Sequence, residues 1–261
     1  MSYVSNGGVR LFYSEAGDGP SVLWHTGGCG DATMWETAGY ISALPGFRHI
    51  LFDHRGHGRS DHPDDIASQP MDLYVDDVVA VLDAAGLERS AMVGYSQGAR
   101  IAYATAMRHP ERMSAVVGLD SLPGETEDPA DFRSGTDEVL RAGTRAVIET
   151  MARHESEPPP RWLVEHLCTT TAQAFAGAYA CFATMGDFWA ALPSLATPVL
   201  FLVAVDEPGD EREQLARKAA ELAARGSFAT LPGLGHLQAF WRTDLSIPPI
   251  AHFLAAHACE E

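Results

Sequence analysis

The stretch Gly94-Tyr95-Ser96-Gln97-Gly98 decides the interpretation of this chain of 261 residues. It follows residues 90–93, a short apolar run typical of a buried strand, and it precedes residues 99–107, which are typical of a helix. A serine between two glycines at a strand-to-helix junction is typical of a nucleophile elbow, a turn sharp enough to strain the backbone of the serine. The glycines let the two elements approach without a Cβ clash, and the start of the helix favours negative charge near the hydroxyl.

Outward from this turn, short apolar runs alternate with amphipathic stretches. Strands are predicted at residues 3–5, 9–15, 21–25, 49–53, 113–119, 198–205 and 227–231. Helices are predicted at residues 31–44, 71–85, 211–225 and 244–257. Strands that alternate with helices predict an α/β fold with a mostly parallel central sheet and helices on both faces. Ligands of such folds bind beyond the carboxyl ends of the strands, and Ser96 lies at one of these ends.

The alternation stops between residues 122 and 193. This stretch contains the turn pair Pro123-Gly124, helical patterns interrupted by Pro158-Pro159-Pro160, and several aromatic residues. We interpret it as a helical cap subdomain inserted into a catalytic domain that consists of residues 1–121 and 194–261. The length of the chain suits one large α/β domain with such an insertion.

The composition argues against several classes of function. The formal net charge is −17, so the phosphate backbone of a nucleic acid would be repelled. Hydrophobic residues make up 46% of the chain, which is enough for a sizeable core. No apolar run approaches the roughly 18 residues of a membrane span, and residues 1–8 lack the basic and apolar regions of a signal peptide. We therefore expect a cytoplasmic protein with no nucleic-acid or membrane partner, while its oligomeric state is not indicated.

The cysteines point to no special chemistry. They are Cys29, Cys168, Cys181 and Cys259, and their spacing matches neither a disulfide framework nor a zinc site. We expect reduced thiols, in agreement with a cytoplasmic location. The sequence also has no dinucleotide-binding or phosphate-loop motif. No metal and no cofactor are therefore expected.

A serine hydroxyl is a weak nucleophile at neutral pH and needs a neighbouring base. Among the eleven histidines, His236 is the best candidate because it follows the last predicted strand in the glycine-flanked loop 231–237. Such a loop can carry the imidazole back over the sheet to Ser96. We predict that His236 accepts the Ser96 proton and later delivers it to the leaving group. The alternative is a histidine that only caps the last helix.

A carboxylate is needed to fix the histidine tautomer and to stabilise the imidazolium. The expected place is the end of the strand at 198–205, and the order Ser, Asp, His along the chain suits this type of fold. Asp206 is the preferred candidate because it is the first carboxylate after that strand. Glu207, one position later, and Asp120, at the end of the strand at 113–119, are the alternatives.

The negatively charged oxygen of a tetrahedral intermediate needs amide donors, which form an oxyanion hole. The backbone N–H of Gln97, directly after Ser96, is the first candidate. The second comes from the glycine-rich turn 26–30, where Gly27 is the simplest choice and Gly28 is the alternative. A glycine at this place lets a substrate approach the amide closely.

These features together resemble the α/β-hydrolase superfamily, over residues 9–122 and 194–258. The resemblance rests on the elbow, the glycine-rich turn, Gly235-His236 and the loop at residues 53–60, in which we interpret Asp53 and Arg55 as structural partners. Haloalkane dehalogenases and epoxide hydrolases of this superfamily carry aspartate at the elbow, and dienelactone hydrolases carry cysteine. The serine of this chain therefore favours esterases, lactonases, perhydrolases, carbon–carbon bond hydrolases and certain lyases.

Aromatic residues near the elbow and in the cap are candidates for the substrate pocket; they are Trp35, Tyr95, Phe182 and Trp189. They indicate a modest, largely apolar substrate. The prediction is a serine hydrolase that cleaves a small carboxylic ester or lactone through an acyl-enzyme. The same residues could instead serve carbon–carbon bond hydrolysis or a biosynthetic lyase or cyclase step. A ligand-binding protein that has lost turnover is the third alternative, which intact Ser96 and His236 oppose.

Overall fold

The computed structural model describes residues 2–122 and 129–258. Its centre is a sheet of eight strands in the order β1-β2-β4-β3-β5-β6-β7-β8. The strands are β1 (Ser2–Asn6), β2 (Val9–Ala16), β3 (Ser21–His25), β4 (Arg48–Asp53), β5 (Ser90–Tyr95), β6 (Met113–Leu119), β7 (Val199–Val205) and β8 (Gly226–Pro232).

Most neighbouring strands of this sheet are parallel. β2 runs antiparallel to β1 and to β4, and the remaining pairs from β4 to β8 are parallel. Every residue of the central strands β5, β6 and β7 is buried, as helices on both faces of a sheet require. The mostly parallel α/β sheet predicted from the sequence is confirmed.

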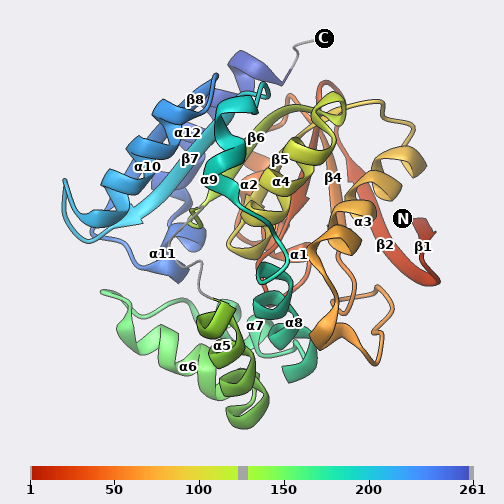
Figure 1. The fold of residues 1–261 in the computed structure, drawn as a ribbon, viewed down its shortest axis with the longest axis vertical. Helices are drawn as coiled ribbons and strands as arrows, with labels where there is room; N and C mark the ends of the chain where they lie inside the picture. Colours follow the sequence, from red (N-terminus) through yellow and green to blue (C-terminus); the bar gives the residue numbers. More distant parts are fainter. Residues whose placement is uncertain (1, 123–128, 259–261) are drawn as a thin grey trace.

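Helices connect the strands and cover the sheet (Figure 1). They are α1 (Thr33–Thr37), α2 (Tyr40–Ala43), α3 (Met71–Ala84), α4 (Gln97–Arg108), α5 (Pro129–Ala142), α6 (Thr144–His154), α7 (Arg161–Leu167), α8 (Ala172–Phe182), α9 (Phe188–Ala191), α10 (Glu211–Leu222), α11 (His236–Trp241) and α12 (Thr243–His257). Buried side chains of α3, α4 and α10 form one apolar core with the sheet. Those of α1, α2 and α12 form a second core, so helices cover both faces.

The helix predicted over residues 31–44 is divided into α1 and α2. Gly39 stands between them with φ 93°, in the left-handed region that glycine adopts without steric cost. Its amide donates to the carbonyl oxygen of Glu36, and this hydrogen bond closes the last turn of α1. The apolar spacing continued across this glycine, and the spacing alone therefore predicted one helix instead of two.

Helices α5–α9 lie between β6 and β7 in the sequence, and we call residues 129–191 the insert. Figure 1 shows α5–α8 grouped together at one end of the sheet, in green and teal. The proline run at 158–160 separates α6 from α7, where the sequence predicted an interruption. The insert packs closely on the main domain, since a Cβ at Gly177 would lie 2.6 Å from the Ile66 carbonyl oxygen.

Candidate active site

Ser96 stands at a sharp turn between β5 and α4. Its backbone has φ 54° and ψ −115°, a conformation that costs a residue other than glycine about 1–3 kcal/mol. A Cβ at Gly94 would lie 2.1 Å from the Gly98 carbonyl oxygen, and a Cβ at Gly98 would lie 2.4 Å from the His25 carbonyl oxygen. The two glycines of the elbow are therefore required by the close contact of β5, α4 and β3.

His236 lies at the first position of α11 and faces Ser96. The Ser96 Oγ is 3.0 Å from Nε2 of the imidazole, so the hydroxyl can donate its hydrogen to this nitrogen. Tyr95 stacks on the imidazole with ring centroids 5.1 Å apart, and its hydroxyl donates to the His236 carbonyl oxygen over 2.9 Å. The structure thus brings together a serine and a histidine that are 140 positions apart in the sequence.

Asp120, directly after β6, holds the other side of the imidazole. Nδ1 of His236 donates to Oδ2 of Asp120 over 2.7 Å. The other oxygen, Oδ1, accepts from the Ala204 amide over 2.8 Å and lies 2.9 Å from the Arg212 guanidinium. Burial opposes the ionisation of Asp120, but the hydrogen bond and charge of His236, with the charge of Arg212, outweigh it and lower the pKa. Such a carboxylate can fix one tautomer of the imidazole and stabilise its charged form.

The structure corrects the prediction of Asp206 as this carboxylate. β7 ends at Val205, and Asp206 is an exposed residue whose amide donates to the Asp210 side chain over 2.9 Å. Glu207 is exposed in the same loop. His236 follows β8, and β7 lies next to β8 in the sheet, so the order of strands alone would also permit a carboxylate after β7. The contact of Asp120 with the imidazole, and the outward direction of the loop at Asp206, decide the assignment.

Gln97 and Gly27 lie where two amides could donate to an oxygen bound beside Ser96. Gln97 is the first residue of α4, so its N–H has no acceptor within the helix. Gly27 lies against Ser96, since a Cβ on it would be 3.1 Å from the Ser96 Cβ. Gly28 instead faces the insert, where a Cβ would lie 2.6 Å from the Cβ of Ala178. The geometry favours Gly27 over Gly28 as the second donor.

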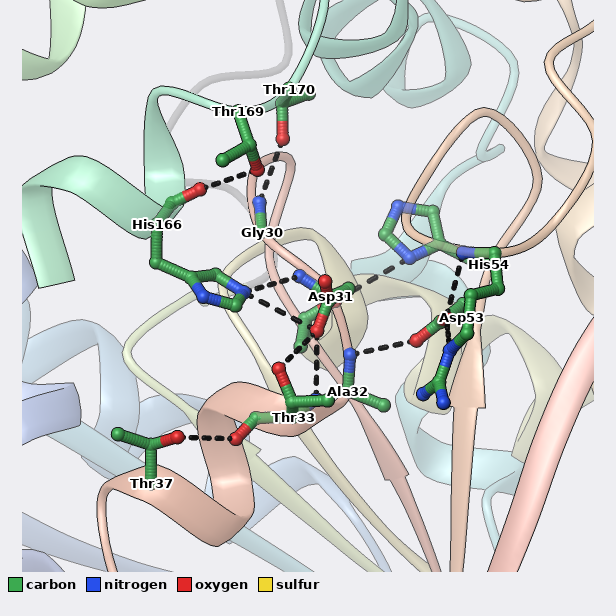
Figure 2. Close-up of polar contacts among 12 residues, drawn as sticks. Gly30, Asp31, Ala32, Thr33, Thr37, Asp53, His54, His166, Thr169 and Thr170 are labelled. Atoms are coloured by element: carbon green, nitrogen blue, oxygen red, sulfur yellow. Dashed lines mark hydrogen bonds and ion pairs between the residues drawn. The ribbon is translucent and has the colours of Figure 1, made fainter. Parts of the chain in front are cut away.

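The glycine-rich turn is anchored to the insert (Figure 2). The buried Thr170 side chain accepts from the Gly30 amide over 2.8 Å. Nε2 of His166 lies 3.4 Å from the Asp31 amide and 3.3 Å from the Asp31 carboxylate. Burial opposes the charge of Asp31, but hydrogen bonds from His166 and Thr33 outweigh it and lower its pKa. The insert thus holds the segment that carries Gly27.

The loop at residues 53–60 supports the same turn from the opposite side. The buried Asp53 carboxylate accepts from the amides of Ala32 and Arg59, each over 2.9 Å. Arg55 forms a buried bidentate ion pair with Asp77, with both nitrogen–oxygen distances at 2.6 Å. Because both side chains are buried in these contacts, the structure agrees with the interpretation of Asp53 and Arg55 as structural partners.

Three histidines that the sequence analysis did not single out are stacked in a row, and the first of them, His25, lies beside Gly98 of the elbow. The ring centroids of His25 and His54 are 4.6 Å apart, and those of His54 and His57 are 3.7 Å apart. Burial lowers the pKa of His25 to about 4 and also lowers the pKa of His54 and of His57. The three rings are therefore neutral at pH 7. Nothing in the sequence indicated this cluster, because the three residues come together only in the fold.

His236 lines two cavities. The smaller, of about 40 Å³, lies on the Ser96 side and is mostly apolar; its lining includes Gly27, Tyr95, Ile148, Met151, Leu167 and Phe175. The larger, of about 350 Å³, lies on the Asp120 side; its lining includes Arg100, Ser121, Asp131, Phe132, Tyr179 and Phe182. Side chains of the insert contribute to both cavities, so the insert shapes the space around the serine and the histidine.

Two of the predicted pocket residues line these cavities: Tyr95 the smaller and Phe182 the larger. Trp35 is placed elsewhere, and its prediction is corrected. It is fully buried, and its ring packs on the rings of Tyr40 and Phe240 with centroids 4.8 and 5.0 Å apart. It therefore belongs to the core between the sheet and its helices.

Trp189 is also placed away from the two cavities, and its prediction is corrected too. It lies on α9, where the Lys218 ammonium is 4.4 Å from the centroid of the ring. The ring packs against the core on the α3, α4 and α10 face of the sheet. Its aromatic character suited a pocket, but α9 turns it toward α10, and this direction is not visible in the sequence.

The described residues offer few other reactive groups. Within residues 2–122 and 129–258, no three His, Cys, Asp or Glu side chains are grouped so as to hold a metal ion. In the same part of the chain, no helix combines the length and apolar character that crossing a bilayer requires. Cys29, near Ser96, is a free thiol whose pKa is raised by burial, so it is a poor competing nucleophile. Cys259 lies outside the described residues.

Known proteins share this sequence pattern. Residues 20–150 match a family model described as alpha/beta hydrolase fold. The bifunctional esterase/perhydrolase DCH of Acinetobacter calcoaceticus is 31% identical over 261 aligned residues, which cover 90% of this chain and 93% of that protein. The non-heme chloroperoxidase of Streptomyces lividans is 28% identical over 255 aligned residues, which cover 88% of this chain and 90% of that protein.

Solved structures share the architecture. A thermophilic esterase from Thermogutta terrifontis superimposes with a TM-score of 0.80 and 24% identity, over 98% of each chain. The enol-lactonase from Burkholderia xenovorans LB400 superimposes with a TM-score of 0.81 and 19% identity, over 97% of this chain and all of that one. At these identities the likeness concerns the fold alone.

Proposed function

The chain belongs to the α/β-hydrolase family, and we propose that it is a serine hydrolase that cleaves a small, largely apolar carboxylic ester or lactone. The observation that carries this proposal is the continuous row of hydrogen bonds from Ser96 through His236 to Asp120, at 3.0 and 2.7 Å. A base within this distance can remove the hydroxyl proton as the oxygen attacks a carbonyl. The carboxylate at the far end stabilises the imidazolium that results.

In the first half of the reaction, Ser96 Oγ bonds to the carbonyl carbon while its proton moves to Nε2 of His236. The carbonyl oxygen becomes negative and accepts hydrogen bonds from the amides of Gln97 and Gly27. The carbon–oxygen bond to the leaving group then breaks, and Nε2 returns the proton to the departing oxygen. The products of this half are an alcohol and an acyl group bound to Ser96.

In the second half, water takes the place of the alcohol. Nε2 of His236 accepts a proton from the water as its oxygen attacks the acyl carbon, and the same amides stabilise the negative oxygen. The bond to Ser96 breaks, Oγ regains the proton from Nε2, and the carboxylic acid leaves. Water is the second substrate, and no cofactor enters the cycle.

We assign the acyl part of the substrate to the smaller cavity and the alcohol part to the larger one. The smaller cavity begins at Ser96 and Gly27, where an acyl carbonyl must lie, and its walls are mostly apolar. The larger cavity is on the Asp120 side of His236, the residue that protonates the leaving oxygen. Because the insert lines both cavities, we propose that it acts as a cap that selects the substrate.

Substitution of Ser96 tests the proposal directly. We expect Ser96→Ala to abolish turnover of an activated aryl acetate and to prevent labelling by a fluorophosphonate, while the fold is retained. The matched control is Ser68→Ala, at an exposed serine whose hydroxyl donates only to a local carbonyl oxygen. Ester turnover by Ser96→Ala at the wild-type rate would refute the proposal, as would a wild-type protein that neither hydrolyses esters nor becomes labelled.

Perhydrolysis is a second candidate, favoured by the name of the relative from Acinetobacter calcoaceticus. Hydrogen peroxide would then replace water in the second half of the reaction, and the acyl group would leave Ser96 as a peracid. Both activities need the same acyl-enzyme, so Ser96→Ala should remove both. The ratio of peracid to acid formed from one ester in the presence of peroxide distinguishes the two activities.

A further inference from the structure

We propose that Glu155, from the insert, is a positioning residue for His236, and this inference rests on the function proposed above. Glu155 directly follows α6, and its carboxylate accepts from the Leu237 amide over 2.8 Å and from the Gln238 amide over 3.0 Å. These are the two residues that follow His236 in α11. Two charge-assisted hydrogen bonds to successive amides fix the turn from which the imidazole projects.

Gly235 shows how closely Glu155 approaches the histidine. A Cβ at Gly235 would lie 2.4 Å from Oε2 of Glu155, so any side chain at this position would displace the carboxylate. The φ of Gly235 is −87°, which every residue type adopts. A side chain at position 235 would therefore break the contact with the insert, although the backbone conformation would permit one.

Ser156 extends the contact between the insert and the histidine loop. Its hydroxyl donates to Oε1 of Gln238 over 2.9 Å, and the same oxygen accepts from the Gly235 amide over 3.0 Å. Residues 155 and 156 of the insert therefore bind the loop both before and after His236. A segment held on both sides of one residue leaves that residue little freedom to shift.

His236 follows a less buried strand of the main domain than Ser96 and Asp120 do. Ser96 and Asp120 follow β5 and β6, whose residues are all buried at the centre of the sheet. His236 follows β8, an edge strand with several partly exposed residues. Misplacement of a reacting group by about 1 Å can cost about a hundredfold in rate. Glu155 therefore acts on catalysis through the position of His236, without contact to the substrate.

Kinetics of Glu155 variants test this role. We expect Glu155→Ala to lower kcat for an aryl acetate about 10- to 100-fold, with KM unchanged within about twofold, because the bonds that orient His236 are lost. Glu155→Gln keeps one acceptor oxygen and should recover part of the lost rate. The matched control is Glu157→Ala, two positions later, where the exposed carboxylate lies 4.0 Å from Arg242; this variant should keep the wild-type kcat.

Gly235→Ala tests the same contact from the loop. We expect it to lower kcat about as much as Glu155→Ala, and we expect the double variant to fall no further, because both changes break one contact. Losses that multiply in the double variant would overturn the proposal. A lower melting temperature of Glu155→Ala with a wild-type kcat would also overturn it, since that is the signature of a purely structural residue.

A readout without turnover separates this proposal from the proposed function. The proton on Nδ1 of His236, shared with Asp120, gives a low-field NMR signal when the pair is in place. We expect this signal in the wild type and in Glu157→Ala, and its loss in Glu155→Ala. A signal that persists in Glu155→Ala overturns the positioning role. Loss of the signal in Glu155→Ala supports that role even if the wild type hydrolyses no ester, a result that would refute the proposed function alone.

Discussion

Ser96 and Asp120 follow adjacent parallel strands, and both have a positive φ, 54° and 52°. Among the residues that the structure describes, they are the positive-φ residues other than glycine. Tyr95 pairs with Leu119 in the sheet, so the two turns start side by side at the same edge. Strain of this kind collects at functional sites, where the surrounding structure holds it in place. The two turns place the Ser96 hydroxyl and the Asp120 carboxylate on either side of the His236 imidazole.

Asp120 is therefore expected to be the carboxylate that activity requires. Asp120→Asn should lower kcat about 10⁴-fold, because an amide fails to fix the needed tautomer of His236. Asparagine tolerates a positive φ, so the turn after β6 should be retained. Asp206→Asn is the matched control and should keep the wild-type kcat, since Asp206 is exposed in another loop. Aryl ester kinetics measure both, and a comparable loss in the two variants would contradict the assignment.

Thr170 is expected to support the oxyanion hole from the insert. Thr170→Val keeps the shape of the side chain but removes the acceptor of the Gly30 amide, and a buried unpaired N–H costs about 1–3 kcal/mol. We expect lower thermal stability and a kcat reduced about tenfold, since the segment that carries Gly27 loses an anchor. Thr169→Val is the control, because its hydroxyl donates to the His166 carbonyl oxygen at the exposed surface (Figure 2). Equal effects of the two substitutions would argue against this role.

The stacked histidines predict a loss of stability in mild acid. The pKa of His25 is about 4 in the folded chain and 6.5 when unperturbed, so between these values the unfolded chain binds a proton that the folded chain does not. The free energy of unfolding therefore decreases as the pH falls from about 6.5 to about 4, by roughly 3 kcal/mol for His25 alone.

Denaturant unfolding at several pH values across this window measures the effect. His25→Asn should flatten the dependence on pH, because this position then no longer takes up a proton on unfolding. His252→Asn, at an exposed histidine of α12, is the control and should leave the dependence unchanged. A slope that is the same in the wild type and in His25→Asn would contradict the contribution assigned to His25.

The cavity of about 40 Å³ beside Ser96 predicts a preference for short acyl chains. Each methylene that fits a pocket poorly changes kcat/KM by roughly 10- to 200-fold, so an aryl acetate should be cleaved far faster than the corresponding octanoate. Met151→Ala should enlarge the cavity and shift the preference toward longer chains. Leu140→Ala, at an exposed position of α5, should not. A chain-length profile that is flat in the wild type would remove the cavity as the source of specificity.

Most of the fold could be predicted from the sequence, because short apolar runs indicate buried strands and amphipathic stretches with helical spacing indicate helices. The elbow was equally visible, since its glycines stand at a fixed spacing around Ser96 in the sequence. His236 could be predicted from the glycines around it. The break between α1 and α2 was missed because one glycine with a positive φ outweighs a continuous apolar pattern.

The remaining parts of the site depend on contacts between distant segments. Asp120 and Asp206 both follow buried strands, and only the folded structure shows that the Asp120 carboxylate is the one in contact with His236. The directions of Trp35 and Trp189 depend on helix packing, which their residue type does not indicate. The contacts of Glu155 and Thr170 join residues more than 80 positions apart, so local patterns carried no trace of them.

The insert is joined to two loops of the proposed active site, through Thr170 on one side and Glu155 on the other. Replacement of the whole insert by a foreign lid would therefore remove two anchors of the catalytic geometry along with the pocket walls. Redesign of specificity in this protein is better directed at single wall positions such as Met151, with the two anchors left in place.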